Sequence, residues 1–484
     1  MSAATFLAKE GWEVDVLEKH AVPGGRARVF KEKGFTFDMG PSWYWMPDVF
    51  DRYFECFGKK VSDYYRLIRL DPSYRVYYND GPMDVPADYE ALKKLFESIE
   101  PGSSIKLDAF LKEAAYKYQV GIHKLVHKPG RSVTEFLDMD LAKGLFRLDV
   151  FTSMKSHVRK YFSNPRLVQL MEFPVLFLGA LPSEIPALYS LMNYADIKLG
   201  TWYPHGGMFN IADAMYKLAT ELGVKFHFNC DAEKLIPHNK KIKKIIATET
   251  LDGKQIKKEF EADVFVGGAD YHFIETQLLP ESHQSYSAEY WDKRVMAPSC
   301  LLYYVGLNKK LTGITHHSLF FDVDFDLHGK EIYSNPQWPT EPLFYVSAPS
   351  QTDNTVAPEG CENLFFLIPV AAGLNDDNHE LREQYFRKIV DRYEKITGNY
   401  ISESIIFKKS YAVADFKRDY NAFKGNAYGL ANTLWQTSIL KPSLKSKKAD
   451  NLYYTGQLTV PGPGVPPSLI SGEVVSKEII KAFK

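Results

Sequence analysis

The sequence predicts an α/β fold, and three observations lead to this prediction. In residues 2–9 (SAATFLAK) the apolar side chains, among them Ala3 and Leu7, recur at helical spacing, and Gly11 stands where a helix ends. The next segment, WEVDVLE, alternates apolar and polar residues as a strand does and ends on an acid, Glu18. Much later, DVFVGGAD is typical of a buried strand that finishes in glycines. A helix followed by such a strand forms the second and third parts of a βαβ dinucleotide-binding unit.

The remaining elements follow from changes of pattern along the chain. Strand and turn patterns, including GFTFDMG and YRVYYNDGPMDVP, fill about the first 80 residues, and helical periodicity dominates from about residue 89 to 199. TWYPHGGMFNIADAMYKLATELGVKFHFN then predicts a turn, an amphipathic helix and a strand. Residues 232–270 predict a β-meander with turns at HNKK and LDGK, whose lysines we expect on a solvated face. Residues 290–409 mix strands such as CLLYYVGL with a helix at HELREQYFRKIVDRYEKI, and the chain closes with a strand, a Pro/Gly loop and a helix.

Composition excludes several classes of function. The chain has 484 residues, enough for two or more domains, and its apolar share of 45% and charged share of 25% are ordinary for a globular protein. A formal net charge of −1 argues against wholesale binding to nucleic acid. The most apolar windows, FPVLFLGALP and LFFLIPVAAGL, are about half as long as the roughly 20 residues that span a bilayer, so we expect no transmembrane helix.

Cysteine and histidine usage indicates a reducing compartment and no metal site. Cys56, Cys230, Cys300 and Cys361 are widely spaced and form no CxxC pair, so we expect four reduced thiols in the core. None of the 13 histidines shows the spacing of metal ligands. Aromatic residues make up 14% of the chain, and they can build either a core or a pocket for a large apolar ligand.

Two features near the N-terminus suggest a dinucleotide ligand. Glu18 ends a predicted parallel strand, where its carboxylate can accept two hydrogen bonds from a ribose diol; a solvated glutamate at a strand end is the alternative. In the GGRAR that follows, Gly24 and Gly25 allow close approach of the backbone, and Arg26 offers a planar charged fork suited to pyrophosphate oxygens. Adjacent glycines alone indicate only a turn, but a strand ending in Glu, then PGGR, then FDMGPS is far more specific.

At this point the chain resembles a known family. VDVLEKHAVPGGRARVFKEKGFTFDMGPSWY resembles the start of a flavoprotein of the carotenoid desaturase group, within the wider amine oxidase and phytoene desaturase superfamily. NLYYTGQLTVPGPGVPPSLISG resembles the C-terminal signature of that group, and TWYPHGGMFNIADAM, APEGCENLFFLIPV and DFKRDYNAFKGNAYGL also match its run. The resemblance covers essentially the whole chain in order.

The resemblance implies a discontinuous, Rossmann-like FAD-binding domain and a mixed α+β substrate-binding domain. The FAD-binding domain would comprise residues 1–80, 202–290 and 410–484, and the substrate-binding domain residues 81–201 and 291–409.

It also implies FAD as the cofactor and names the residues expected to bind it. These are Glu18, Lys19, Gly25, Arg26, Gly40, Pro41, Ser42, Gly456, Val465 and Pro466. The final helix, near Ser468, should direct its positive end at the flavin ring, with Gly456, Val465 and Pro466 closest to the ring.

The family also predicts a segment before Met1. Its members begin with a strand and a GxGxxG turn, and Met1 stands where the residue after the last glycine would be. We therefore expect a missing piece of roughly 15 residues, whose turn would face the FAD pyrophosphate. Two explanations compete, a start codon assigned too late or a defective protein, and we favour the first because everything downstream looks intact.

The activity implied is removal of hydrogen from a long uncharged C40 polyene, phytoene on its way to lycopene. No side chain is identified as the catalytic base. Bacterial relatives often carry an acid and an arginine before a Phe-x-x-hydrophobic-Gly segment, whereas Asn164 and Val168 stand there in this chain, with Arg166 displaced. Any mechanism that needs such a pair is therefore in doubt. His205, beside a glycine pair, and Arg166 are the catalytic candidates, and a structural turn histidine is the alternative for His205.

Two further expectations concern the substrate. Trp43, Tyr44 and Trp45 follow GPS in the sequence and either wall a polyene tunnel or belong to the core. Because a C40 hydrocarbon resides in lipid and no span is predicted, we expect a cytoplasmic protein in peripheral contact with the membrane through helical residues 141–199. In LAKGLFRLDVFTSMKSHVRKYF, apolar residues there lie beside Lys143, Arg147, Lys155 and Lys160.

Three alternatives remain open. Two are enzymes, acting on a hydroxylated carotenoid or oxidising an amine, and amine oxidation would need an aromatic cage that PGPGVPPSL does not supply. The third is a non-catalytic binder, such as a GDP-dissociation inhibitor or a prenyl-protein escort, which shares the fold without flavin. Retention of PGGR and PGPGVPP argues against a binder. The number of double bonds introduced, the electron acceptor and the oligomeric state stay open.

Overall fold

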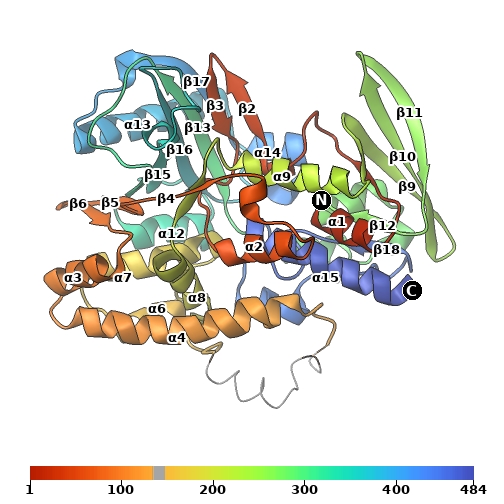
Figure 1. The fold of residues 1–484 in the computed structure, drawn as a ribbon, viewed down its shortest axis with the longest axis horizontal. Coiled ribbons are helices and arrows are strands. Elements are labelled where there is room, and N and C mark those ends of the chain that lie inside the picture. Colours follow the sequence, from red (N-terminus) through yellow and green to blue (C-terminus); the bar gives the residue numbers. More distant parts are fainter. Residues whose placement is uncertain (133–134, 136–147, 484) are drawn as a thin grey trace.

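The computed structural model describes residues 1–132, 135 and 148–483 (Figure 1). The described helices are α1 (Ser2–Lys9), α2 (Pro47–Glu55), α3 (Tyr89–Ile99), α4 (Ser103–His123), α6 (Met154–Val158), α7 (Pro165–Glu172), α8 (Leu191–Tyr194), α9 (Phe209–Glu221), α10 (Tyr271–Phe273), α11 (Ala288–Asp292), α12 (Phe325–Tyr333), α13 (His379–Thr397), α14 (Val413–Tyr420) and α15 (Val465–Phe483). The strands are β1 (Asp15–Leu17), β2 (Val29–Glu32), β3 (Phe35–Asp38), β4 (Leu67–Arg69), β5 (Tyr74–Tyr78), β6 (Gly81–Val85), β7 (Trp202–Pro204), β8 (Lys225–His227), β9 (Cys230–His238), β10 (Lys241–Leu251), β11 (Lys254–Glu261), β12 (Phe265–Gly267), β13 (Ser299–Leu307), β14 (His317–Phe320), β15 (Phe344–Ser347), β16 (Glu362–Val370), β17 (Ile405–Tyr411) and β18 (Leu452–Tyr454).

The largest sheet has seven strands in the order β17-β13-β16-β15-β14-β5-β6. Strand β13, which pairs with β17 on one side and β16 on the other, is buried along its whole length, and its side chains alternate between two cores as the period of a strand requires. Leu301, Tyr303 and Val305 pack in one core with the apolar side of α13, whereas Leu302 and Tyr304 belong to the other core. The sheet therefore separates α13 from the interior in which the candidate site lies.

Both ends of the chain meet in a second region. The pairs β1–β8 and β12–β18 are parallel, as the α/β prediction requires, and α1 packs along α15 beside them (Figure 1). Ser2 Oγ donates a hydrogen bond of 2.6 Å to the carbonyl of Leu469. This approach needs glycine at position 472, where a Cβ would stand 2.5 Å from the Cβ of Ser2. The meander β9–β10–β11 extends from this region as predicted.

A helical layer of α3, α4, α6, α7 and α8 covers the remaining side of the interior (Figure 1). Leu107, Phe110 and Ala114 on α4 are fully buried in the main core, against which α8 also packs. None of the helices that the structure describes is long and apolar enough to cross a membrane. The part of the expected membrane-facing segment at residues 141–147, with Lys143 and Arg147, lies outside the described residues.

Two local expectations need correction. The strand predicted over WEVDVLE is shorter, Asp15–Leu17, because only these residues pair with β8. All four cysteines are free, but only Cys230 and Cys300 are buried in the core. Cys56 ends α2 and Cys361 precedes β16, and both are only half-buried because these element ends lie near the surface.

Candidate active site

One cavity of about 1630 Å³ runs from the parallel strand pairs to the helical layer. Its volume exceeds the roughly 300–1,000 Å³ of a site for one drug-sized ligand, so it has room for more than one. All ten residues expected to bind a cofactor line this cavity. The structure therefore brings together residues that lie more than 400 positions apart in the sequence.

At the strand end of the cavity, Glu18 follows β1 directly. Its Oε1 accepts a hydrogen bond of 2.9 Å from the backbone N–H of His20, and burial raises the pKa of its carboxyl above the ordinary value. The neighbouring Lys19 directs its ammonium to the carbonyl of Arg418 at 3.1 Å and to Asp231 at 4.0 Å. Glu18 thus keeps acceptor capacity toward the cavity, while the charge of Lys19 is shared with protein groups.

The turn after β1 places Arg26 against the cavity wall. Its Nη1 donates to the carbonyls of Asn426 and Ala427, at 2.6 and 3.1 Å, and burial lowers the pKa of its guanidinium. The sequence predicted that the guanidinium is directed at pyrophosphate. Instead, carbonyls of the protein accept hydrogen bonds from one of its nitrogens, and only the remaining donors are available to a ligand. Gly40 lies against the same turn, and a Cβ there would stand 2.5 Å from the carbonyl oxygen of Arg26.

The C-terminal loop and the start of α15 form another wall. Gly456, Val465 and Pro466 line the cavity together with Gly462 and Ser468. The helix macrodipole gives this helix start a partial positive charge, although its two prolines carry no N–H to donate. An electron-rich group would be stabilised here.

The opposite end of the cavity is apolar. It lies between the sheet face carrying Leu302, Tyr345 and Leu367 and helical-layer residues such as Ile122 and Leu191. Because few polar groups face this end, a long uncharged chain is the kind of ligand that it suits.

The sequence left open whether Trp43, Tyr44 and Trp45 wall a tunnel or belong to the core, and the structure divides them between the two roles. Trp43 and Trp45 line the cavity, whereas Tyr44 does not, and it stacks on Phe50 with ring centroids 4.4 Å apart. Tyr44 therefore belongs to the core.

The two catalytic candidates, His205 and Arg166, lie outside the set of residues that line the cavity. His205 sits 3.6 Å from the carboxylate of Asp353 and does not line the cavity. Arg166 pairs with Asp80 at the surface, and its Nε donates to Asp80 over 2.9 Å. Neither reaches a ligand in the cavity, so we assign neither a catalytic role. Asn164 caps the start of α7 through its side chain.

Three polar residues at or beside the cavity were missed. Asp270 lines the cavity and follows the strand VFVGG much as Glu18 follows β1. An acid just after a strand that ends in glycines is therefore the sequence pattern that could have identified Asp270. Burial raises the pKa of Asp270 to about 6, while Arg26 acts to lower it. Asn432 and Lys441 lie in an irregular segment without a local pattern, and only the tertiary structure identifies them.

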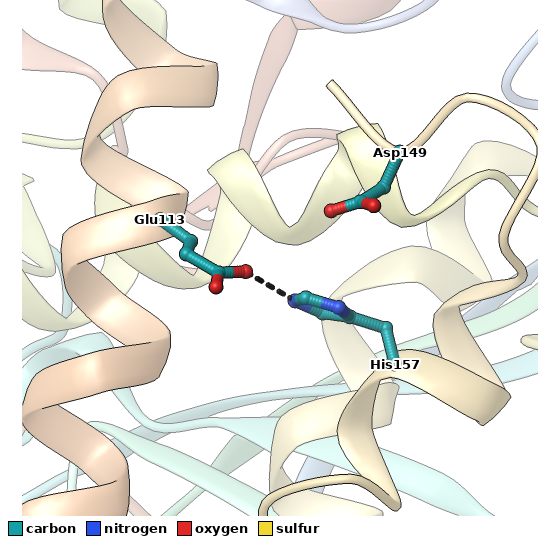
Figure 2. A group of neighbouring side chains, drawn as sticks. All are labelled: Glu113, Asp149 and His157. Atoms are coloured by element: carbon teal, nitrogen blue, oxygen red, sulfur yellow. Dashed lines mark ion pairs between the residues drawn. The ribbon is translucent and has the colours of Figure 1, made fainter. Parts of the chain in front are cut away.

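A separate cluster in the helical layer contains Glu113, Asp149 and His157 (Figure 2). These three side chains could hold a cation by their chemistry alone. However, the ammonium of Lys117 lies 2.9 Å from the carboxylate of Asp149 and 3.5 Å from Nε2 of His157. Lys117 already supplies the positive charge that this cluster accommodates, so we assign no metal to it.

Comparison with known proteins places the chain in a family. A sequence model described as flavin-containing amine oxidoreductase matches residues 1–480. The chain belongs to this family. A carotenoid 3,4-desaturase of Haloarcula japonica is 39% identical over 483 residues, which cover 99% of this chain and 96% of that protein. A zeta-carotene-forming phytoene desaturase of Myxococcus xanthus is 29% identical, with 99% and 92% covered.

A crystal structure of an oxidoreductase from Methanosarcina mazei shares the fold, with a TM-score of 0.61 and 16% identity over 98% of this chain and 97% of that one. The resemblance to carotenoid desaturases inferred from the motifs is thereby confirmed, and the chain is an oxidoreductase.

The family implies FAD, and the cavity fits such a group. At Gly25 and Gly456, which both line it, no heavy atom lies within 4 Å of the place where a Cβ would stand. Two separate stretches of backbone are therefore open to a ligand that can approach closely. Glu18, Arg26 and the start of α15 provide an acceptor, a cation and a partial positive charge around the same space.

Proposed function

We propose that this protein is an FAD-dependent carotenoid desaturase that removes hydrogen from CH–CH groups of a C40 polyene, phytoene on its way to lycopene. The observation that carries the proposal is the single cavity. It joins the residues expected to hold flavin to an apolar end large enough for a long hydrocarbon. The family to which the chain belongs and the names of its relatives support the reaction class.

In this proposal residues 1–80, 202–290 and 410–484 form a Rossmann-like FAD-binding domain, and residues 81–201 and 291–409 bind the substrate. The parallel pairs β1–β8 and β12–β18, and the packing of α1 on α15, support the first assignment. The cavity lies where the two sets of residues meet.

Flavin, when bound, supplies a hydride acceptor for an allylic carbon of the polyene. The residues of the chain do the rest. Glu18 would accept hydrogen bonds from a ribose diol, the donors of Arg26 that do not bind protein carbonyls would bind phosphate oxygens, and the positive start of α15 would stabilise negative charge on the ring. Trp43, Trp45 and Leu302 orient the uncharged chain and exclude water.

The test is to load purified protein with FAD, supply phytoene in liposomes and identify the products by chromatography. We expect desaturated products, and we expect Leu188→Trp, which fills the apolar end, to lower turnover at least tenfold with unchanged flavin content. The matched control is Ile105→Trp at a side chain 75% exposed on α4. Equal turnover by both variants, or flavin binding without any desaturation, contradicts the proposal.

A second candidate is desaturation at the 3,4 position of a more desaturated polyene, favoured by the 39% identity to a carotenoid 3,4-desaturase. The same assay with lycopene in place of phytoene separates the two, because only one of the polyenes should be consumed efficiently. Binding of prenyl lipids by protein that takes up no FAD would favour a non-catalytic escort instead.

We further propose that the cavity opens toward the membrane and that the protein is a peripheral protein of the cytoplasmic face, consistent with four free cysteines. Leu148 and Val150 line the cavity, and the adjacent Phe151 is 86% exposed. Leu434 lines it too, and the adjacent Trp435 is 78% exposed. Exposed aromatic side chains beside an apolar cavity suit insertion into a lipid interface.

Co-sedimentation with liposomes tests this membrane proposal. Changing Phe151 and Trp435 together to Ser should lower the bound fraction severalfold, whereas Tyr400→Ser, at a side chain 70% exposed, should not. Unchanged binding of the double variant would refute this location of the contact.

A further inference from the structure

Asn432 carries a buried amide without a partner at the wall of the cavity. Only 3% of the residue is exposed, and its side chain makes no hydrogen bond with any residue that the structure describes. Several side chains of the described residues bury a polar atom without a hydrogen bond, but among them only Asn432 lines the cavity. Because an unsatisfied buried amide costs free energy, its position in the wall points to a partner that a ligand supplies.

The amide lies beside the loop that precedes α15. A Cβ on Gly462 would stand 3.1 Å from Oδ1 of Asn432 and 3.4 Å from its Nδ2. Gly462 also lines the cavity and has no side chain, so it leaves the amide uncovered on this side. Nζ of Lys441 stands 3.4 Å from the same Cβ position, but it makes no hydrogen bond with the amide.

Two other polar side chains of this part of the cavity wall already have protein partners. Nε2 of Gln457 donates to Oδ1 of Asn426 over 3.2 Å, and Oγ of Ser468 donates to the carbonyl of Gly464 over 2.8 Å. Asn432 differs from both because its donor and its acceptor are free for a molecule in the cavity.

We propose that the carboxamide of Asn432 binds the pyrimidine edge of the flavin ring. This inference rests on the proposed function, and within it only on FAD as the cofactor. That edge of the ring presents one N–H, at position 3, between two carbonyl groups. A carboxamide presents an acceptor beside a donor, so Oδ1 can accept from the ring N–H while Nδ2 donates to a neighbouring carbonyl oxygen.

The location of Asn432 favours the ring over the other ligand groups expected in the cavity. Glu18 and Arg26, where ribose and pyrophosphate are expected, lie at its strand end. Gly456 and Val465, expected closest to the ring, stand on either side of Gly462 in the sequence. The proposed polyene is a hydrocarbon and has no polar group that could pair with an amide.

The pairing should also affect the reduction of the flavin. Reduction adds negative charge to the ring, and its pyrimidine carbonyl oxygens carry part of that charge. A hydrogen bond strengthens when its acceptor becomes charged, so Nδ2 of Asn432 should bind the reduced ring more tightly than the oxidised ring. Asn432 should therefore raise the reduction potential of the bound flavin.

The experiment uses the full-length protein and the variants Asn432→Leu and Asn432→Asp, both close to asparagine in shape. The matched control is Asn335→Leu, at an exposed asparagine. Thermal unfolding first shows that each variant is folded. Each protein is then titrated with FAD and with FAD methylated at ring position 3, and the reduction potential of bound FAD is measured anaerobically against a reference dye.

Wild-type protein and the control should bind the methylated FAD at least about tenfold more weakly than FAD, because the methyl group removes the N–H that Oδ1 accepts. Asn432→Leu should bind FAD about tenfold more weakly and should discriminate little between the two forms. If it also loses a tenfold preference for reduced over oxidised FAD, its potential should fall by about 30 mV.

Asn432→Asp separates the two hydrogen bonds. Its carboxylate still accepts from the ring N–H, so this variant should keep the discrimination against methylated FAD. It has no donor and adds a negative charge beside the ring, so its potential should fall further than that of Asn432→Leu.

Equal discrimination by wild type and Asn432→Leu overturns the inference, as does an unchanged potential in both variants. If wild type discriminates against methylated FAD and Asn432→Leu does not, but no polyene is desaturated, the proposed reaction is wrong and the role of Asn432 stands. If the protein takes up neither form of FAD, both proposals fail.

Discussion

Replacing Lys441 by methionine should stabilise the protein without its cofactor. Methionine has a similar length and no charge, so it removes the cost of burying an amine. The folded-state pKa of Lys441, about 7, lies below the ordinary 10.5, which means that the fold favours the neutral form. The cost is therefore absent above about pH 10.5, grows as the pH falls and is complete below about pH 7.

The magnitude follows from the two pKa values. They differ by about 3.5, and at about 1.4 kcal/mol for each pKa unit the full cost is about 5 kcal/mol. At about pH 9.5 only about 1.4 kcal/mol of this cost remains, because that pH lies only about one unit below the ordinary pKa of 10.5. The advantage of the methionine variant should thus shrink by about 3 kcal/mol between about pH 6.5 and pH 9.5.

Urea unfolding of both proteins at these two pH values, with circular dichroism as the probe, measures the effect. Flavin must be removed beforehand, because a bound ligand adds its own stabilisation. An advantage that is the same at both pH values, or no advantage at all, would show that burial does not hold the amine neutral.

Three further predictions follow from the cavity and the core. Gly40→Ala, whose Cβ would lie 2.5 Å from the carbonyl oxygen of Arg26, should cost about 1–3 kcal/mol in unfolding experiments and reduce the flavin that co-purifies. Glu18→Gln should weaken FAD binding about tenfold in a titration, whereas Glu10→Gln at an exposed position should not. Burial raises the pKa of Asp196 from 3.8 to about 6, so the folded protein is destabilised once this carboxyl ionises. The penalty is absent below about pH 4 and reaches about 3 kcal/mol above about pH 6. Asp196→Asn should remove this pH dependence, which unfolding experiments at about pH 4 and pH 7 would measure.

Local sequence patterns predicted those helices, strands and turns that depend on neighbouring residues. The alternation around Asp15–Leu17, the helix at Ser2–Lys9 and the meander with its LDGK turn all depend on residues close in sequence. The ten residues expected to bind the cofactor all line one cavity. They were predicted from the motifs of the family and not from local patterns.

The remainder depends on contacts that no local pattern encodes. The parallel pairing of Ser318 with Arg75 joins segments far apart in the chain, and neither segment carries a signal for its partner. In the run Trp43–Trp45 three similar residues could not be assigned to cavity or core before the packing was known. Lys441 looks like any surface lysine in sequence, and only its burial distinguishes it.

If one cavity holds flavin at one end and a polyene at the other, the bound polyene should reduce the flavin directly. Anaerobic mixing of FAD-loaded protein with phytoene in liposomes, followed by absorbance, measures this reaction. We expect the flavin absorbance to bleach while the absorbance of a longer conjugated polyene appears, with one flavin reduced for each double bond formed. Flavin that stays oxidised although the polyene is bound would show that the cavity does not bring the two together.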